Sequence, residues 1–514
     1  MTEGGCRTAR SGASAGLLSG GVPGGNGFRF AVISAVTGLV TLVSGCTVGP
    51  NFEPPAPPPV ESFVPGPSKS GLENTKVVVA DIPYRWWELF RSKGLSRLIE
   101  EGFAQNPDIL SAEAAVRVAQ ANSRVSRGAL LPQVEGSFNP TRQMISENAN
   151  TSDVPSGART YSVITAQLSV SYVADVFGGT RRQIEAADAL TEAQEFQREA
   201  AYLTLAANIA LAAVQEMSLR GQISTTTRII GSQTSLLDVL RKQHQAGQIA
   251  EPDVAAQETA LAQAKMLLPG LQKQLEAQRH SLSVLTGRFP SQGVNAQFQM
   301  GSIALPHTIP VSLPADLILQ RPDVRVAQAN MRQANAQIGV ALANRLPQIT
   351  LTGNLGNSAV AMSQLFSPHT GLWMLAGNVL QPIFSAGTLL NKQIAAEENF
   401  AQVEAQYRTV VLTAFQNVAD SLRALQADSR ALVAAKEAER AAERSFELTR
   451  RQIERGQSSV QLLLTTQQAF LQTSIARVQA EAQLLTDAIL LFQSLGGGWW
   501  NKAADPQLVT ANRH

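Results

Sequence analysis

The sequence is poor in the residues from which catalytic and metal centres are built. Its 514 residues include two cysteines and five histidines. The histidines are scattered along the chain, at His244, His280, His307, His369 and His514. None has a metal-ligand spacing to another histidine or to a cysteine, and there is no phosphate-binding glycine loop, nucleophile elbow or redox cysteine pair. The sequence therefore predicts a protein that is not an enzyme and holds no cofactor and no metal.

Aromatic residues and excess charge are also scarce. Aromatic residues make up 5% of the chain, charged residues 16%, and the formal net charge is +2. Without clustered lysine and arginine, nothing favours a nucleic-acid partner. The 44% share of hydrophobic residues excludes a disordered chain. Abundant alanine and glutamine suit long helices with narrow apolar seams better than a thick globular core.

The N-terminal region carries the features of an export signal. An apolar stretch over residues 30–43 follows an arginine, leads into small residues and is too short for a comfortable membrane span. The segment LVSGC at residues 42–46 resembles the bacterial lipobox, whose cysteine receives a diacylglycerol. We therefore predict a signal peptide over residues 1–45 and a lipid on Cys46, with an uncleaved anchor or a chance cysteine as the alternative. By resemblance to bacterial lipoproteins, Thr47 favours the outer membrane.

Proline dominates the next segment, at Pro50, Pro54, Pro55, Pro57, Pro58 and Pro59. Such a segment is stiff and extended. Residues 46–80 are therefore predicted to form a lipidated, proline-rich tether that lets the body of the protein stand off from its anchor.

The rest of the chain repeats itself, up to a C-terminal tail over residues 501–514. The landmarks recur in one order: NPD at residues 106–108 and RPD at 321–323, LPQ at 131–133 and 346–348, AGQ at 246–248 and RGQ at 455–457, LTG at 285–287 and LGG at 495–497. This order predicts two structural repeats, over residues 81–312 and 313–500, each far longer than the unit of a solenoid.

Within each half the hydrophobic period changes to two. The alternation predicts β-hairpins over residues 133–177 and 348–384, each with two strands of about ten residues. Strands of that length cross a bilayer when tilted. Polar loops over residues 141–160 and 358–371 are expected to be exposed. A soluble sandwich with one wet face is the alternative, but four strands are too few to close a sheet.

Long proline-free runs of helix formers follow the hairpins, over residues 180–244 and 388–455. At about 1.5 Å per residue, each run approaches ~100 Å if unbroken. Gly221 and Gly231 are expected to interrupt the first run.

The helices that return from these runs carry a heptad seam, with apolar positions spaced alternately three and four residues apart. The seam positions are Leu261, Ala264, Leu268, Leu271, Leu275, Gln278, Leu282 and Leu285, then Leu464, Gln468, Leu471, Ile475, Val478, Ala482, Leu485, Ile489 and Phe492. Pro269 is expected to kink the first return helix. Narrow seams on long helices predict a wall of helices with left-handed supercoiling, whereas an ordinary bundle would have shorter helices and wider apolar stripes.

The strands must be completed by other subunits. Four membrane strands cannot close a barrel, and an open sheet edge is not allowed in lipid. Three copies would supply twelve strands and bring twelve long helices into a hollow cylinder. The predicted fold is mainly α with a small membrane β-barrel: a trimeric 12-stranded β-barrel, with four strands per chain, on a long, internally duplicated α-helical barrel.

Several motifs together resemble those of one family. They are GCTVGP at residues 45–50, WWELF at 86–90, NPD at 106–108, LPADL at 313–317, RPD at 321–323 and LGGGW at 495–499. Over essentially residues 46–500 the chain resembles the outer membrane factor family of TolC-like ducts, and within it the lipidated NodT/OprM type. One departure is Gln320, where such proteins often carry arginine.

The resemblance implies a function and a set of partners. The chain would be the outer-membrane exit duct of a tripartite efflux pump, lipid-anchored, with its helical part in the periplasm. It would act as a homotrimer, dock to a periplasmic membrane-fusion adaptor and an inner-membrane RND pump, and pass small toxic compounds outwards. In this family the hairpin tips dock to the adaptor and narrow the tunnel. The tips here are residues 247–253 and 456–462, with Gly247 and Gly456 as the turns.

The resemblance also suggests a gate. Asp253 falls where TolC-like tips place a gate-forming acid, and Arg450, Arg451 and Arg455 are its candidate partners. Helix capping explains Asp253 nearly as well, and a solvated basic face explains the arginines equally well.

Two other functions stay open. An outer duct for type I protein secretion shares this architecture. A structural coiled-coil stalk would explain the heptads, but neither the paired strands nor the duplication.

Overall fold

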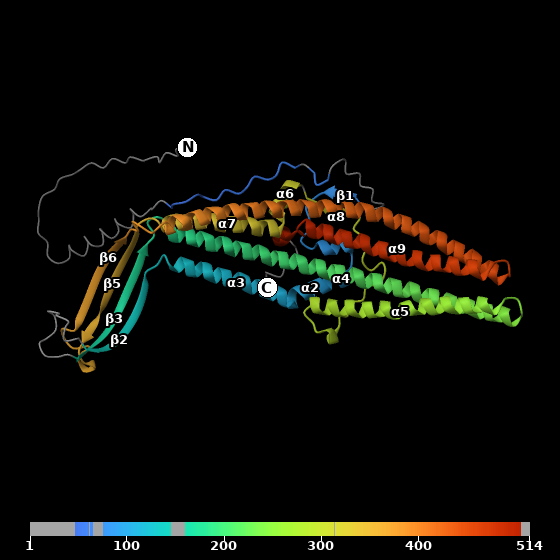
Figure 1. The fold of residues 1–514 in the computed structure, drawn as a ribbon, viewed down its shortest axis with the longest axis horizontal. Helices are drawn as coiled ribbons and strands as arrows, with labels where there is room; N and C mark the ends of the chain where they lie inside the picture. Colours follow the sequence, from blue (N-terminus) through green and yellow to red (C-terminus); the bar gives the residue numbers. More distant parts are fainter. Residues whose placement is uncertain (1–46, 61, 65–75, 145–159, 313, 505–514) are drawn as a thin grey trace.

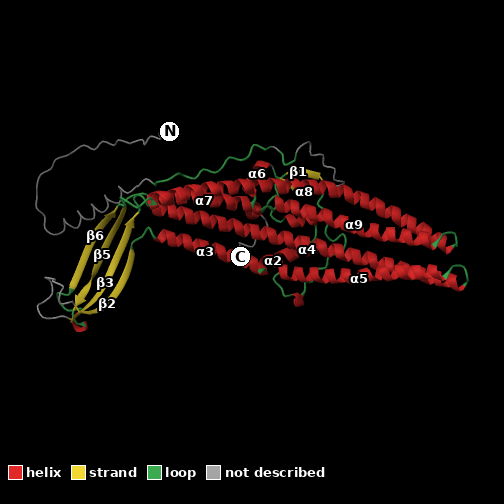
Figure 2. Cartoon of the chain, in the orientation of Figure 1, coloured by secondary structure: helices red, strands yellow, loops and turns green. Residues whose placement is uncertain are grey.

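The chain folds into a long body with a β-sheet at one end and helices along the rest (Figure 1, Figure 2). The structure, a computed structural model, describes residues 47–60, 62–64, 76–144, 160–312 and 314–504. Two helices, α4 (Gly179–Gln245) and α8 (Thr388–Glu454), run from the sheet to the far end. Shorter helices lie beside them, so the described residues form an elongated wall.

The internal duplication is confirmed by the order and lengths of the elements. The first half holds α2 (Lys93–Gln105), α3 (Pro107–Gly128), β2 (Gln133–Met144), β3 (Thr160–Ala174), α4 and α5 (Glu251–Leu285). The second half holds α6 (Pro314–Gln320), α7 (Pro322–Ala343), β5 (Gln348–Ala359), β6 (Gly371–Leu380), α8 and α9 (Val460–Ser494). Matching helices have equal lengths: α3 and α7 have 22 residues, α4 and α8 have 67, and α5 and α9 have 35.

The long helices are less interrupted than the sequence suggested. The prediction that Gly221 and Gly231 break the first run is wrong, because α4 is continuous through both. A Cβ on Gly221 would lie 2.8–2.9 Å from Met300 and Val478, so this glycine permits close packing rather than a break. Helix α4 has the length and composition of a membrane span, but 56% of its apolar window is buried inside the protein, as in an ordinary core helix. Helix α5 also continues through Pro269, whose kink stays a prediction.

The seam of α9 was predicted only in part. From Val478 onwards the predicted positions are buried, but Gln468 is exposed. Nearer the tip the buried side lies one residue earlier, at Leu463 and Phe470, where Phe470 stacks on Phe446 of α8 at 5.8 Å between ring centroids. At this level Phe470 packs against α8, so the buried face of α9 is rotated by one residue relative to the predicted seam.

The strands form one antiparallel sheet in the order β2-β3-β5-β6. The predicted hairpins end too late, because β3 stops at Ala174 and β6 at Leu380. After β3, the Asp175 carboxylate accepts the backbone N–H groups of Thr180 and Arg181 at 2.9 and 3.0 Å, which turns the chain into α4. The outer loops were predicted to begin too early, at residues 141 and 358, because β2 continues to Met144 and β5 to Ala359. Residues 145–159 lie outside the described residues.

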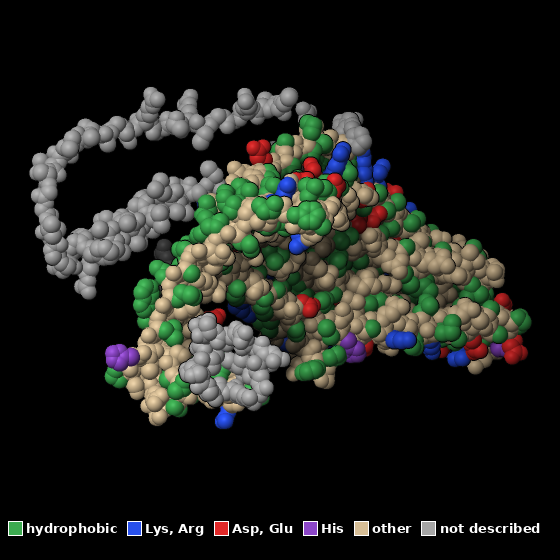
Figure 3. Space-filling view, turned by 60° about the vertical axis from the view of Figure 1, so that its left-hand side comes forward, with side chains coloured by type: hydrophobic (Ala, Val, Ile, Leu, Met, Phe, Trp, Pro, Cys, Tyr) green, Lys and Arg blue, Asp and Glu red, His purple; other side chains and the backbone are tan. Residues whose placement is uncertain are grey.

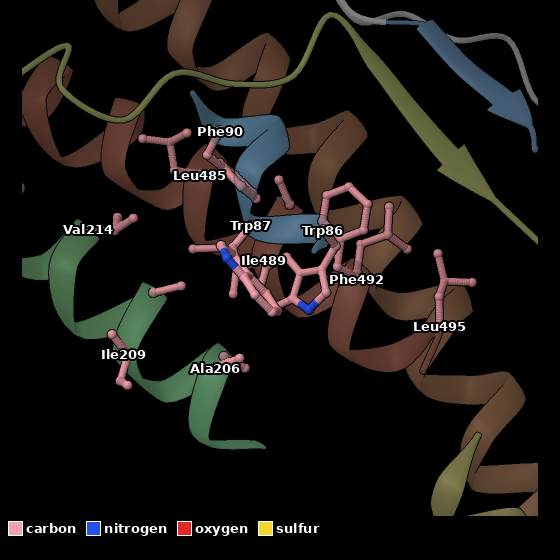
Figure 4. Packing of buried hydrophobic residues seen from close by; sticks show 14 of the residues in the cluster. Trp86, Trp87, Phe90, Ala206, Ile209, Val214, Leu485, Ile489, Phe492 and Leu495 are labelled. Atoms are coloured by element: carbon pink, nitrogen blue, oxygen red, sulfur yellow. The ribbon is translucent and has the colours of Figure 1, made fainter. Parts of the chain in front are cut away.

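An aromatic core joins the two halves (Figure 4). The 3-10 helix η1 (Trp86–Phe90) inserts Trp86 against Phe492 of α9, with ring centroids 5.5 Å apart. Both side chains are buried, and Ala206 and Ile209 of α4 belong to the same cluster. The core therefore fixes α4 of the first half against α9 of the second.

A small second sheet was not predicted. Strands β1 (Lys76–Val79) and β4 (Thr308–Val311) pair in parallel. The predicted tether, which was to extend to residue 80, therefore ends in a paired strand. The remaining short elements are η2 (Pro290–Gln292), η3 (Met362–Gln364) and η4 (Trp499–Ala504).

The opening triplet of each half lies against its closing glycine. In the first half the Asn106 side chain caps α3 and also donates to Leu285 O at 3.0 Å, at the end of α5. In the second half Arg321 Nη1 donates to Ser494 O at 2.8 Å, at the end of α9. A Cβ on Gly287 would lie 2.4 Å from the backbone oxygen of Gln105. The opening and closing landmarks of each half therefore mark the same contact, made once in each half.

We expect Gly287→Ala to destabilise the protein by roughly 1–3 kcal/mol, because the residue has φ +73° and no space for a Cβ. Gly128→Ala is the matched control, since Gly128 ends α3 and a Cβ there meets nothing within 4 Å. Thermal unfolding of the two variants measures the difference. Equal melting temperatures would show that the contact with Gln105 is not a constraint.

Candidate functional site

The sheet has one predominantly apolar face, on which Asn357, opposite Ala166, is a polar exception. Residues directly opposite each other in an antiparallel ladder share a face, so the register sorts the side chains. The central residues of this face are Val134, Gly136, Phe138, Pro140, Ile164, Ala166, Leu168, Val170, Tyr172, Ala174, Ile349, Leu351, Gly353, Leu355, Trp373, Leu375, Gly377 and Val379. Several are largely exposed, Trp373 and Leu375 at 79% and 78%. An apolar face this exposed fits lipid and not water.

The opposite face of the sheet is polar on three of its four strands. It carries Glu135, Ser137, Asn139, Gln167, Ser169, Ser171, Thr350, Thr352 and Asn354. On β6 the same face holds Leu372, Met374 and Ala376 instead, as the irregular sequence of this strand suggested. On the side that Figure 3 shows, acidic and basic side chains gather over the helices, and far fewer lie at the sheet end. One face of the sheet therefore suits lipid and the other an aqueous passage.

Both edges of this sheet are open within the described residues. Strand β2 pairs only with β3, and β6 pairs only with β5, so each has one unpaired side. Unpaired backbone N–H and C=O groups cannot remain in hydrocarbon, where each costs several kcal/mol. The four strands that one chain supplies therefore cannot form a complete membrane-spanning sheet, because β2 and β6 each lack a neighbouring strand.

The N-terminal strap, residues 47–60, does not stand free. Arg182 of α4, 3% exposed, donates from Nε to Val48 O at 3.0 Å. Its Nη2 donates to Gly49 O at 3.0 Å and to Asn51 Oδ1 at 2.9 Å. The prediction of a stand-off tether is wrong for these residues, because one buried guanidinium satisfies three acceptors of the strap.

The strap also bridges the two halves of the chain. Its Val48 N–H donates to Phe177 O at 3.1 Å, between β3 and α4. Asn335 of α7 donates to Pro50 O at 3.0 Å. The strap thus begins where the sheet meets the helices. Nothing in the sequence singled out Arg182, which lies more than 130 residues from its partners. Cys46, the predicted lipid site, lies outside the described residues.

The two hairpin tips share one backbone geometry. Gly247 and Gly456 have φ of +73° and +71°. In both tips the glycine N–H donates to the carbonyl three residues before it, at 2.8 and 2.9 Å, and the next N–H donates to the carbonyl five residues before it, at 2.9 and 2.8 Å. This is the Schellman motif, which needs a left-handed residue. Both glycines are exposed, so the turns are free to meet another molecule.

The predicted gate residues are near the tips but are not brought together. Asp253 lies half-buried in the first turn of α5, and Arg455 is exposed at the C-terminal end of α8. Arg450 pairs with Glu447 at 2.7 Å. Among the residues that the structure describes, no ion pair joins Asp253 to Arg450, Arg451 or Arg455.

Two contacts that the sequence did not reveal hold the tips. Gln243 Nε2 of α4 donates to Ile453 O of α8 at 3.2 Å and so joins the two hairpins. Arg241 of α4 pairs with Glu258 of α5 at 2.7 Å within the first hairpin. In the described part of the chain, no group of three or more His, Cys, Asp or Glu side chains could hold a metal ion.

We expect Arg182→Ala to release the strap, with a loss of roughly 1–3 kcal/mol, because three acceptors lose their buried donor. Limited proteolysis should then cut within residues 47–60. Arg127→Ala is the control: this arginine, with a side chain 61% exposed, pairs with Asp188, and its loss should cost less than about 1 kcal/mol. Equal protease resistance in both variants would contradict the role given to Arg182.

Known proteins share both the sequence and the fold. The family model of outer membrane efflux proteins matches residues 98–288 and 313–497. The pyoverdine export outer membrane protein OpmQ of Pseudomonas putida is 28% identical over 81% of this chain and 88% of its own length. The toluene efflux pump outer membrane protein TtgC of Pseudomonas putida is 26% identical over 91% and 95%.

A solved structure agrees with these sequence matches. The CmeC outer membrane channel of Campylobacter jejuni superposes with a TM-score of 0.81, at 22% identity, over 88% of this chain and 95% of its own. This likeness shows the fold, and the family match covers both repeats. The chain belongs to the outer membrane efflux protein family and is an outer-membrane efflux channel.

Proposed function

We propose that three copies of this chain form a single duct across the outer membrane and the periplasm. The observation that carries this proposal is the four-stranded sheet with one apolar face, one largely polar face and two open edges. Pairing β6 of one copy with β2 of the next satisfies both edges. Three copies give twelve strands, enough for a pore whose inner wall is the polar face.

The helical tips are the proposed docking site for a periplasmic adaptor, which would join the duct to an inner-membrane RND pump. Both tips lie at the end of the body furthest from the sheet (Figure 1). Gly247 and Gly456 are exposed in identical turns, so each copy offers two equivalent contact points. The relatives named as efflux pump outer membrane proteins support this assembly.

The N-terminal strap supports a lipid anchor on Cys46. Val48 is hydrogen-bonded at the junction of the sheet and α4, and Cys46 precedes it by two residues, a reach of at most about 7 Å. A diacylglycerol there enters the membrane at the inner rim of the apolar face. The anchor then reinforces the position of the barrel and does not act as a loose tether.

The cargo is proposed to be small organic compounds. The names of two relatives, for pyoverdine export and toluene efflux, cover both a polar and an apolar compound. A wide pore with a polar wall imposes little selection on such compounds. Selection then belongs to the pump.

Single-channel conductance in a planar bilayer tests the proposal, with the native mass measured on the same sample. We expect a trimer that conducts. A monomer, or a trimer that stays silent after substitution of both tips, contradicts it.

Asp253 is proposed to form an acidic ring at the tip in the trimer. Asp253→Ala should weaken block of the current by divalent cations, because three carboxylates are lost from one narrow level. Glu251→Gln is the control, being an exposed acid of the same helical turn. Identical block in both variants and the wild type would assign Asp253 to helix capping.

The two faces of the sheet predict opposite effects for neighbouring residues of β3. Leu168→Arg places a charge on the apolar face and should cost about 2–4 kcal/mol near the bilayer midplane, with loss of assembled protein from the membrane. Gln167→Arg points to the other face and should leave assembly intact while it lowers cation conductance. Membrane fractions and bilayer currents measure the two effects. Equal loss of both variants would contradict the assignment of the faces.

A further inference from the structure

Two carboxyl groups meet between α8 and α9, far from both the sheet and the tips. Asp487 of α9 is 3% exposed. Gln483 Nε2 donates to its Oδ1 at 3.1 Å, whereas its Oδ2 is buried and has no hydrogen-bond partner among the described residues. When it is protonated, this carboxyl group can form a side-chain hydrogen bond with Asp428 of α8. Two ionised carboxylates have no proton to share, so this contact is favourable only when one of them is protonated.

Among the described residues, no cation is a cause of the pKa shift of Asp487. On α8, the exposed Arg423 and Arg430 bond to Gln426. On α9, Arg477 pairs with Glu481 at 2.9 Å and with Glu439 of α8 at 2.7 Å.

The helix α4 also packs on α9. Its buried side chains there are Ile209, Ala210, Ala213 and Val214. Its nearest buried acid, Glu216, is held by arginines of α4 and α5. Among the interactions that shift the pKa of Asp487, the one charged group is Asp428, a like charge.

This environment favours the neutral form of the acid. Burial raises the pKa of Asp487 from 3.8 to about 7, and the hydrogen bond and repulsion from Asp428 act in the same direction; only the Gln483 hydrogen bond opposes them. The group therefore titrates near neutral pH, within the range of an extracytoplasmic compartment.

We propose that Asp428 and Asp487 form a proton-binding site in the helical wall, where one shared proton holds α8 against α9 and its loss loosens their packing. On α9, Asp487 lies 27 residues after Val460, where the helix begins, which is ~40 Å along the helix at 1.5 Å per residue. The site is therefore far from the tip at Gly456. The proposal concerns a single chain and does not depend on conduction or on a partner.

The sign of the pH dependence follows from the raised pKa. Between pH 4 and pH 7, about the unfolded and folded values, the folded chain binds more protons at this site than the unfolded chain. Stability from this site is therefore fully present below about pH 4 and is lost as the pH rises through about 7.

Thermal unfolding of the purified full-length protein in detergent at pH 5.5 and at pH 8.0 tests the proposal. Asp487→Asn removes the titrating group and keeps the shape, so it should melt higher than the wild type at pH 8.0. It should also reduce the shift in melting temperature between the two pH values by roughly 2 °C or more. Asp420→Asn is the matched control, because Asp420 is an exposed acid of α8, and it should keep the full wild-type shift.

Asp428→Asn gives an independent test if Asp487→Asn folds poorly. It removes the like charge but not the buried acid, so the shift should shrink by less than with Asp487→Asn. A shift in either Asp487→Asn or Asp428→Asn equal to that of the wild type and of Asp420→Asn would overturn the proposal.

Discussion

In the hydrocarbon of a membrane, every backbone N–H and C=O must find a partner inside the protein. This constraint decides the architecture of the whole molecule. One chain supplies four strands, β2, β3, β5 and β6, in a single sheet whose two outer strands each keep an unpaired side. An isolated copy therefore cannot rest in lipid. The proposed closure of the sheet by further copies of the chain follows from satisfying these edges.

Duplication lets one set of contacts serve twice. Each half sends a 67-residue helix away from the sheet and brings a 35-residue helix back, and each pair turns at an exposed glycine. The return helix then ends against the triplet that opened its half, through Asn106 or Arg321. The aromatic core around Trp86 and Phe492 ties the halves together where the four helices overlap. A long thin wall is thus stabilised at its middle and its turns, and not by a thick core.

Local patterns were readable in the sequence, while contacts over long separations were not. Alternation along the strands, the glycine turns and the repeat landmarks are set by neighbours a few residues away, so they predicted the sheet, the tips and the duplication. Arg182 reaches the strap across more than 130 residues, and its position in an ordinary basic pair carries no signal. The Asp487 contact with Asp428 is hidden in the same way. The prediction for Gly221 failed because a glycine in a helix can also mark close packing, here against Met300 and Val478.

The central claim is that other copies of the chain close the sheet. A cryo-electron microscopy map of the purified protein in lipid nanodiscs tests it most directly. The account predicts three copies around one axis, with β6 of each copy hydrogen-bonded to β2 of the next and the face that contains Leu168 and Trp373 turned to lipid. A map with the edges of β2 and β6 unpaired, or with the polar face towards lipid, would contradict it.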